Sequence, residues 1–379
     1  MYSFYRFLVF SLVLLTLPCQ VLRSQTYKEK RSYKEWVRLA PRLDDAFMST
    51  DEAQRIADNV ILYQHTSGGW PKNIYMPAEL SESELREVEK AKDNVDESTI
   101  DNDATSTEII YLSRVFTATG IEKYRDAAIE GIRYLLKMQY ANGGWPQFWP
   151  RNEGYYVQIT YNDEAMVNVM ELLRHVNRKD APFAYVDDEL SAAAGQAFDM
   201  GVECMLNTQY RRDGTLTVWC AQHDRTTLQP CQARAYELPS LSGAETCGIL
   251  NLLMSIENPS DQVCEAIEAG VAWLEANKIT NLRRENFTNE EGKPDYRMVT
   301  CTGADEPCPT IWARFYTLED DRPFFSDRDG VKRYDISEIG YERRNGYGWY
   351  TDKPAKVLRN YEKWKERTKS TSDPASGEQ

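Results

Sequence analysis

The amino-acid sequence predicts an all-α protein in which helix pairs close into an (α/α)₃ toroid, with long irregular loops and minor short β-strands. Two observations lead to this prediction. Apolar residues recur at helical spacing over seven segments, at roughly 49–64, 104–118, 121–139, 163–177, 187–208, 241–256 and 261–277. One short pattern also occurs three times, and its copies lie 75 and 70 residues apart, which fits two helices and a long loop per copy.

The repeated pattern begins at Gln64, Gln139 and Gln209. The first two glutamines precede a GGWP motif, and the third precedes a degraded copy of it that ends at Trp219. Gly and Pro are typical helix stops, so each copy indicates the end of a helix and the start of a loop. The tryptophan in each copy either plugs the loop against the helix end or faces a substrate, and the sequence leaves both interpretations open.

Helix starts are predicted from capping residues. Thr50, Asp103 and Ser240 each stand before a helical segment, where a side-chain oxygen can accept a hydrogen bond from a free backbone N–H group. β-Structure is expected only in short stretches, near 155–161 and 214–219. The sequence therefore predicts helix pairs joined by long loops rather than by a sheet.

The domain organisation follows from composition. Hydrophobic residues make up 42% of the chain and charged residues 27%, which excludes a wholly disordered protein. Residues 25–358 are expected to form a single domain, irregular and rich in Arg, Tyr and Phe from about 300 to 350. Residues 359–379 are expected to form a polar C-terminal tail that is partly disordered.

Residues 1–24 are predicted to be a signal peptide, because Arg6 precedes an apolar run from Phe7 to Leu17 and then Pro18. The run is too short for a transmembrane helix. We therefore expect a secreted or periplasmic protein without stable membrane insertion in its mature form, and we expect a monomer.

The charge balance restricts the partners. The formal net charge is −14, so no global field attracts nucleic acid or an anionic membrane. A polyanionic partner would require local cationic groups or a bound metal ion. We therefore expect no nucleic-acid partner.

Cysteine usage suggests loop staples rather than a metal site. Seven cysteines follow residue 24, all between Cys204 and Cys308. Two pairings, Cys301–Cys308 and Cys220–Cys231, would each close a short loop, and at least one thiol would stay free. The chain has three histidines and no CxxC motif, which argues against a zinc site of Cys/His type.

Two loop clusters carry Asp and Asn just before a helix. The first is TIDND at 99–103, with Asp101 and Asn102, and the second is TYNDE at 160–164, with Asp163. Hard oxygen ligands of this kind suit Ca²⁺. The alternative is that these side chains cap the following helices.

Arginines stand out in two later loops. Arg234 lies in a loop before a helix, and Arg314 and Arg328 lie among aromatic and acidic residues. A guanidinium presents a fork of donors that suits recognition of carboxylate or phosphate groups. The alternative is a set of surface ion pairs in an acidic protein.

Eight stretches taken together resemble the pectate lyases of polysaccharide lyase family ten, from about Thr50 to Trp349. They are GGWPKN at 68–73, TIDND at 99–103, QYANGGWPQF at 139–148, ITYNDEAMVNV at 159–169, WCAQHD at 219–224, ARAYELPSLSG at 233–243, IWARFY at 311–316 and FSDRDGVKRYDISEI at 325–339. The resemblance implies an (α/α)₃ toroid, in agreement with the repeat. It also implies Ca²⁺-assisted β-elimination of polygalacturonate.

The resemblance also implies roles for single residues. Asp101, Asn102 and Asp163 would hold Ca²⁺, and Arg234 would be the catalytic base. The implied substrate-binding residues are Arg314 and Arg328, with Lys72 and Trp145 as weaker candidates. An arginine base requires a neutral guanidinium, so an alkaline optimum is expected.

Two departures from the family pattern are visible. Asp103 stands where a small residue is usual, and Arg225 stands where Pro is common. Two other functions are weighed against the lyase. One is a toroidal glycoside hydrolase that uses paired carboxylates, and the other is a non-catalytic, Ca²⁺-dependent pectin-binding protein.

Overall fold

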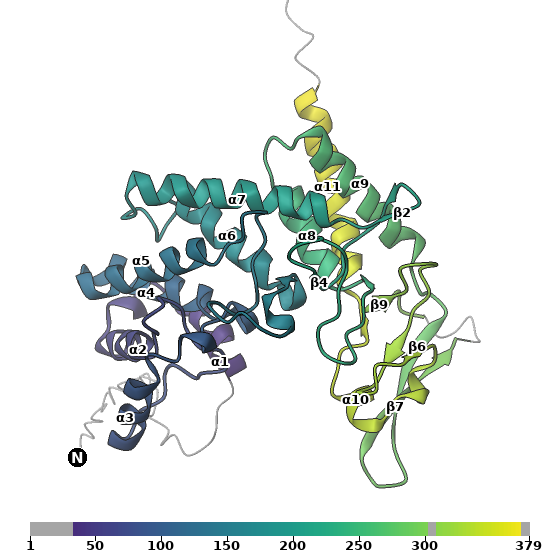
Figure 1. Ribbon diagram of the computed structural model, residues 1–379, viewed down its shortest axis with the longest axis horizontal. Helices are drawn as coiled ribbons and strands as arrows, with labels where there is room; N and C mark the ends of the chain where they lie inside the picture. Colours follow the sequence, from purple (N-terminus) through teal and green to yellow (C-terminus); the bar gives the residue numbers. More distant parts are fainter. Residues whose placement is uncertain (1–32, 302–307, 373–379) are drawn as a thin grey trace, which may run out of the picture. The chain divides into compact units, whose positions relative to one another are not determined.

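The computed structural model describes residues 33–301 and 308–372, so the expected signal peptide lies outside the described residues. About half of the described part is helical (Figure 1). Its α-helices are α1 (Tyr33–Leu39), α2 (Asp51–Leu62), α3 (Glu82–Ala91), α4 (Ser106–Thr119), α5 (Glu122–Lys137), α6 (Ala165–Arg178), α7 (Asp188–Thr208), α8 (Glu245–Met254), α9 (Asp261–Ala276), α10 (Tyr341–Asn345) and α11 (Lys353–Ser372). The helices α2 and α4 to α9 lie where the periodicity predicts them.

The strands are short and pair two at a time, and within the described ranges they close no sheet. A hairpin of β6 (Leu282–Thr288) and β7 (Pro294–Thr300) is the longest pairing there. The other strands have two residues each: β1 (Ile159–Thr160), β2 (Arg211–Arg212), β3 (Thr215–Leu216), β4 (Gln222–His223), β5 (Leu241–Ser242), β8 (Trp312–Ala313), β9 (Phe315–Tyr316), β10 (Phe325–Ser326), β11 (Lys332–Arg333) and β12 (Tyr350–Thr351). Short 3₁₀ helices complete the list: η1 (Ala40–Arg42), η2 (Phe47–Ser49), η3 (Val95–Glu97), η4 (Asp101–Asp103), η5 (Tyr155–Val157), η6 (Asn162–Glu164) and η7 (Ile336–Glu338).

Consecutive helices pack in pairs. α4 lies along α5, α6 along α7, and α8 along α9, with α11 packed on the last pair (Figure 1). Each pair buries apolar residues in one continuous core, for example Leu112 of α4, Leu135 of α5 and Leu173 of α6. This arrangement is compatible with the expected helical toroid, because each pair contacts the next.

The repeated glutamine joins one helix pair to the next. Each copy stands just after a helix, and its Nε2 donates two hydrogen bonds, one to its own loop and one to the corresponding helix of the next pair. The acceptors are the carbonyls of Gly68 and Ala127 for Gln64, of Gly143 and Ala197 for Gln139, and of Thr217 and Ala266 for Gln209, all at 2.8–3.0 Å. The repeat in the sequence is therefore a repeat of one contact between helices.

The tryptophans of the repeat are loop plugs. Each indole N–H donates to a carbonyl of the helix that precedes it, and each side chain is fully buried. The pairs are Trp70 with Val60 at 2.7 Å, Trp145 with Leu135 at 2.8 Å, Trp219 with Met205 at 2.7 Å and Trp312 with Leu274 at 2.8 Å. Trp312 is a fourth copy that the sequence analysis missed, because the β6–β7 hairpin lengthens its loop.

Two of the three predicted caps are wrong. Thr50 does accept a hydrogen bond from the N–H of Ala53, at 3.2 Å. The cap position of α4 is Thr105 rather than Asp103, and that of α8 is Ala244 rather than Ser240. Residue type predicts that a capping residue lies near a helix start but not at which residue the helix begins. Here backbone hydrogen bonds of the preceding loops shift the start to a later residue.

The tail expected from residue 359 is also placed wrongly. α11 runs through this boundary to Ser372, and it buries Val357 and Trp364 against α8 and α9. The polar composition of α11 reflects its solvent face.

One predicted disulfide is present, Cys301–Cys308, whereas Cys220 and Cys231 are free thiols. None of the described helices is both long and apolar enough to cross a membrane.

Candidate active site

Every candidate site residue lies in one of four long loops, which follow α2, α5, α7 and α9. The two-residue strands tie each loop to the next. A bridge joins Thr99 to Phe148, β1 pairs with β4, and β5 pairs with β9. The short strands therefore serve to hold neighbouring loops together, so residues far apart in sequence meet on one loop surface.

The two Asp/Asn clusters share an unusual backbone. Asn102 and Asp103 have φ values of 55° and 61°, and the matching Asp163 and Glu164 have 51° and 64°. This left-handed region is unfavourable for residues other than glycine, although Asn and Asp tolerate it best. Each of the two clusters therefore has two adjacent residues in a strained backbone conformation. Such strain costs free energy, and it is concentrated at functional sites.

Neither cluster caps the helix that follows it. No side-chain capping hydrogen bond is present at the starts of η4, α4, η6 or α6. Asn102 instead donates to Asn73 Oδ1 at 2.9 Å, and Asn162 donates to Asp163 Oδ2 at 2.8 Å. The structure thus removes the main alternative to a ligand-binding role for these residues.

Acidic side chains gather around the first cluster. Asp101 is buried in an ion pair with Lys72, and Asp103 accepts a hydrogen bond from Asn168 at 2.6 Å. Burial raises the pKa of Asp103, and the charges of Glu164, Asp163 and Asp101 raise it further. The two clusters are therefore close enough to repel each other electrostatically.

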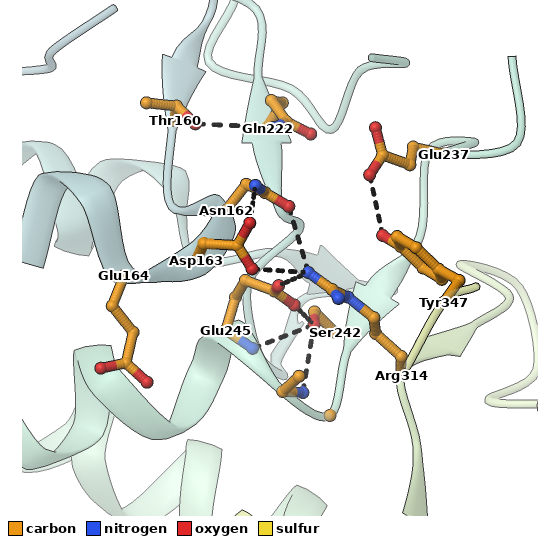
Figure 2. Close-up of polar contacts among 12 residues, drawn as sticks. Thr160, Asn162, Asp163, Glu164, Gln222, Glu237, Ser242, Glu245, Arg314 and Tyr347 are labelled. Carbon is orange, nitrogen blue, oxygen red and sulfur yellow. Dashed lines mark hydrogen bonds and ion pairs between the residues drawn. The ribbon is translucent and has the colours of Figure 1, made fainter. Parts of the chain in front are cut away.

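Arg314 lies against the second cluster (Figure 2). Its Nη2 lies 3.1 Å from Asn162 Oδ1 and 3.4 Å from Asp163 Oδ1, and it also pairs with the buried Glu245. Burial disfavours its charge, but Glu245 and other neighbours outweigh this and raise the pKa of Arg314 above its ordinary value. Its Nε is buried without a hydrogen-bond partner among the described residues.

Arg234 is held by an acid that the sequence analysis did not single out. Its Nε donates to Glu237 Oε2 at 2.7 Å and its Nη2 to Oε1, and Glu237 is buried. Burial again works against the charge of the guanidinium, but the hydrogen bonds and charge of Glu237 raise the pKa of Arg234 above its ordinary value. The guanidinium is thus strongly cationic as it stands.

Tyr347 connects the two arginines. Its hydroxyl donates to Glu237 Oε1 at 2.8 Å (Figure 2). Its ring centre lies 4.6 Å from Arg314 Cζ and 5.8 Å from Arg234 Cζ. Both distances are within the range of cation–π attraction. One half-buried tyrosine, hydrogen-bonded to one buried carboxylate, therefore contacts both Arg234 and Arg314.

Arg328 lies on the exposed β10–β11 turn. Its side chain is 67% exposed and pairs loosely with Glu342, at 3.2 Å. A Cβ atom on Gly330 of the same turn would lie 3.2 Å from the carbonyl of Ala235. The turn that carries the exposed Arg328 therefore packs against the loop that carries Arg234.

Trp145 is the one predicted binding residue that the structure contradicts. Its side chain is fully buried, and its indole N–H donates a hydrogen bond to the carbonyl of Leu135 on α5. It cannot contact a substrate, and the loop-plug interpretation is the right one. Lys72 keeps its Nζ 5.2 Å from the ring centre of Phe148 while pairing with Asp101.

Glu237, Glu245 and Tyr347 were missed because their roles depend on long-range contacts. The only local signal is that Glu237 follows Arg234 by three residues, a spacing at which opposite charges meet in a turn. Across the described residues, no group of three or more His, Cys, Asp or Glu side chains is arranged as a ready metal site. Lys72 and Arg314 form ion pairs with the carboxylates of the two clusters, Asp101 and Asp163.

Comparison with known proteins places this chain in a family. The model of the pectic acid lyase family matches residues 64–358. A family 10 polysaccharide lyase from Cellvibrio cellulosa is 32% identical, with a TM-score of 0.72 over 88% of this chain and 96% of that one. An Asp-to-Ala mutant of a family 10 polysaccharide lyase from the same organism, in complex with trigalacturonic acid, matches with 32% identity and a TM-score of 0.71, over 87% and 96% of the two chains. No curated protein matches the sequence.

Similarity at this level, over nearly the whole of both chains, defines the protein as a polysaccharide lyase. The chain belongs to the pectic acid lyase family, the pectate lyases of polysaccharide lyase family 10.

Proposed function

We propose that this lyase cleaves α-1,4-linked polygalacturonate by Ca²⁺-assisted β-elimination, with Arg234 as the base. The observation that carries the proposal is the meeting of Arg314 with the Asn162–Asp163 cluster, beside Arg234 on the same tyrosine. That arrangement places cationic donors and hard oxygen acceptors on one surface. A family 10 relative bound to trigalacturonic acid supports the substrate class.

The chemistry requires charge stabilisation at the sugar carboxylate. The C5 proton lies α to a carboxylate, so its removal builds enolate-like negative charge on the carboxylate oxygens. Electrons of the C5–H bond form the C4=C5 double bond, the C4–O bond breaks, and the departing oxygen takes up a proton. Guanidinium groups aimed at the carboxylate lower the barrier by offsetting the charge as it develops.

Arg234 is proposed to accept the C5 proton. Its side chain is 41% exposed, and its Nη1 lies outside the pair with Glu237. Only the neutral guanidinium can accept a proton, and Glu237 keeps that form scarce. At a pH below the pKa of Arg234, each rise of one pH unit increases the fraction of neutral base about tenfold, so the expected pH optimum is alkaline.

Arg314 and Arg328 are proposed to bind neighbouring carboxylates of the chain, with Lys72 as a further contact. The Arg314 side chain is 12% exposed, beside the half-exposed Asp163, and Arg328 has a mostly exposed guanidinium. Planar forks of donors suit carboxylates, and they attract a polyanion locally despite a net charge of −14.

Calcium fits the donor set. Asp101, Asn102 and Asp163 are proposed to hold it, and they supply the carboxylate and amide oxygens that this cation prefers. The crowding of three acids, Glu164, Asp163 and Asp101, around Asp103 is repulsive, and a divalent cation would relieve it. When bound, the ion would offset the charge of a substrate carboxylate. Lys72 and Arg314 now balance part of the acidic charge.

The proposal includes closure of the helix pairs into an (α/α)₃ toroid, supported by the repeated glutamine contacts. It also includes export through a signal peptide at residues 1–24 and action as a monomer outside the cytoplasm. Residues 1–24 carry the apolar run on which the export proposal rests.

One assay tests the function. The protein is incubated with polygalacturonate, with calcium or with a chelator, and the ultraviolet absorbance of the new C4=C5 bond is followed. Calcium-dependent growth of absorbance is expected. A glycoside hydrolase would shorten the chain without absorbance and in the presence of chelator, and a binding module would leave the chain length unchanged.

A further inference from the structure

We infer that Glu237 is a positioning residue of the lyase reaction, and that Tyr347 holds Glu237 in place. Glu237 fixes one edge of the Arg234 guanidinium and leaves the other edge toward solvent, where the substrate would bind. This inference rests on the proposed role of Arg234.

The geometry of the pair is that of a clamp. The Glu237 carboxylate accepts hydrogen bonds from Arg234 Nε at 2.7 Å, from Arg234 Nη2 and from the Arg234 backbone N–H at 3.1 Å. A single carboxylate therefore fixes both the main chain and the side chain of the same arginine. Within the described residues no hydrogen bond involves Nη1 of Arg234, so this nitrogen stays available.

The two partners differ in burial. The Glu237 side chain is 4% exposed, and that of Arg234 is 41% exposed. Burying a carboxylate is costly unless its oxygens are satisfied, and here four donors satisfy them, Tyr347 included. A surface ion pair would not require such a buried partner. The clamp thus lies on the protein side of Arg234 and the free edge lies outside.

Tyr347 extends the clamp to Arg314. Its hydroxyl donates to Glu237 (Figure 2), and its ring centre lies 4.6 Å from Arg314 Cζ. Loss of the hydroxyl would free one oxygen of Glu237 while leaving the ring contacts intact. A change at Tyr347 therefore tests the position of Glu237 without changing Glu237 itself.

Glu237 affects the rate in two opposite ways. It orients the base, and a well-placed base contributes roughly 10²–10⁴-fold to a rate. It also keeps Arg234 protonated, together with the other titratable groups that face the guanidinium, Tyr236, Tyr347 and Tyr155. Loss of the Glu237 charge would raise the fraction of neutral Arg234. It would also make the neutral guanidine a weaker base, so the gain in rate is partial. We expect the loss of orientation to dominate.

The test compares Glu237→Gln and Tyr347→Phe with two matched controls. Glu52→Gln removes a bidentate partner of Arg55 at the same spacing of three residues on α2, with Nε–Oε2 at 2.8 Å. Tyr111→Phe removes a buried hydroxyl that donates from α4 to the carbonyl of Ala53 on α2 at 3.1 Å. Both controls should keep the wild-type kcat.

For Glu237→Gln we expect kcat to fall by about 100-fold with KM within threefold, and for Tyr347→Phe a fall of about 10-fold. In Glu237→Gln the rise of kcat with pH should also level off at a lower pH than in the wild type. A purely structural residue would leave the shape of that profile unchanged. Circular dichroism confirms that each variant is folded.

Wild-type kcat in both folded variants would overturn the inference, as would a loss confined to KM. If Glu237→Gln fails to fold, Tyr347→Phe decides the question alone through its kcat and KM. The proposed function fails separately, if Arg234→Ala keeps its activity. An inactive Arg234→Ala beside a fully active Glu237→Gln would refute only the positioning role.

Discussion

Arg314 Nη2 lies 3.4 Å from Asp163 Oδ1, although 151 residues separate the two in the chain. The same nitrogen pairs with the buried Glu245, so one atom of the arginine contacts both a buried carboxylate and the exposed carboxylate of Asp163. This contact joins the second Asp/Asn cluster to the arginines of the last loop. It also sets what a change at Asp163 should do.

Asp163→Asn should fold with near-normal stability and lose activity, and part of that activity should return at high calcium. Asn keeps an oxygen acceptor for Arg314, and the Asp163 side chain is 49% exposed, so the lost ion pair costs about 0–1 kcal/mol. The change removes one negative ligand from a hard cation. Activity against calcium concentration, with thermal melting in parallel, measures both effects.

Asp101→Asn is the contrasting variant. Asp101 is buried and pairs with Lys72, so its neutralisation should lower stability more than the change at Asp163 does, by about 1–3 kcal/mol. It should show the same partial recovery with calcium. If activity in both variants follows only the folded fraction, the two residues are structural and the calcium site has to be abandoned.

Arg234→Ala and Arg234→Lys should both abolish turnover and leave substrate affinity largely intact. A base acts in the transition state, so its loss lowers kcat more than binding. Lysine restores the charge but not the planar fork that Glu237 holds. Steady-state kinetics and binding of trigalacturonate to the inactive variants separate the two quantities. Retention of most of the rate in Arg234→Lys would make Arg234 a charge clamp rather than a base.

Gln139→Ala should destabilise the protein by about 2 kcal/mol without changing kcat of the folded enzyme. The change removes two hydrogen bonds, to Gly143 and to Ala197 of α7, and leaves two carbonyls unpaired. Urea unfolding gives the free energy, and kinetics on the folded protein gives kcat. A drop in kcat at full folding would mean that the repeat contact also positions the loops.

His223→Gln should flatten the loss of stability on acidification. The buried imidazole donates from Nδ1 to Leu228 O at 2.9 Å and accepts the Cys220 N–H at Nε2, at 3.1 Å, so it is held neutral. Burial lowers the pKa of His223 to about 4, despite the opposing hydrogen bonds. The unfolded chain, with an ordinary pKa of about 6.5, takes up this proton first, so stability is lost as the pH falls from about 6.5 to 4.

The comparison with the wild type is needed because another group acts in the opposite sense. Burial raises the pKa of Glu108 to about 7, so its protonation favours the folded state as the pH falls below 7. The difference in the free energy of unfolding between the wild type and His223→Gln should decrease by about 2 kcal/mol as the pH falls from 7.5 to 5. An unchanged gap would show that His223 does not titrate in this range.

The sequence alone determined the helices α2 and α4 to α9 and the repeat, because both are local or periodic signals, whereas α1, α3, α10 and α11 were not predicted. Apolar spacing predicted α2 and α4 to α9 with small errors at their ends, and the Gln and Trp positions marked where each helix stops. The loop clusters were also found from residue type alone, since Asp, Asn and Arg next to a helix start are visible without a structure.

The tertiary structure decided which of these residues share a site and which belong to the core. Trp145 is a plug because α5 lies beneath it, and residues 359–372 are helical because Trp364 packs on α8 and α9. Neither fact is local. The clamp on Arg234 needed Tyr347, 110 residues away from Glu237. A sequence specifies such contacts only through the packing of the whole chain, because a buried charge depends on every neighbour that replaces water around it.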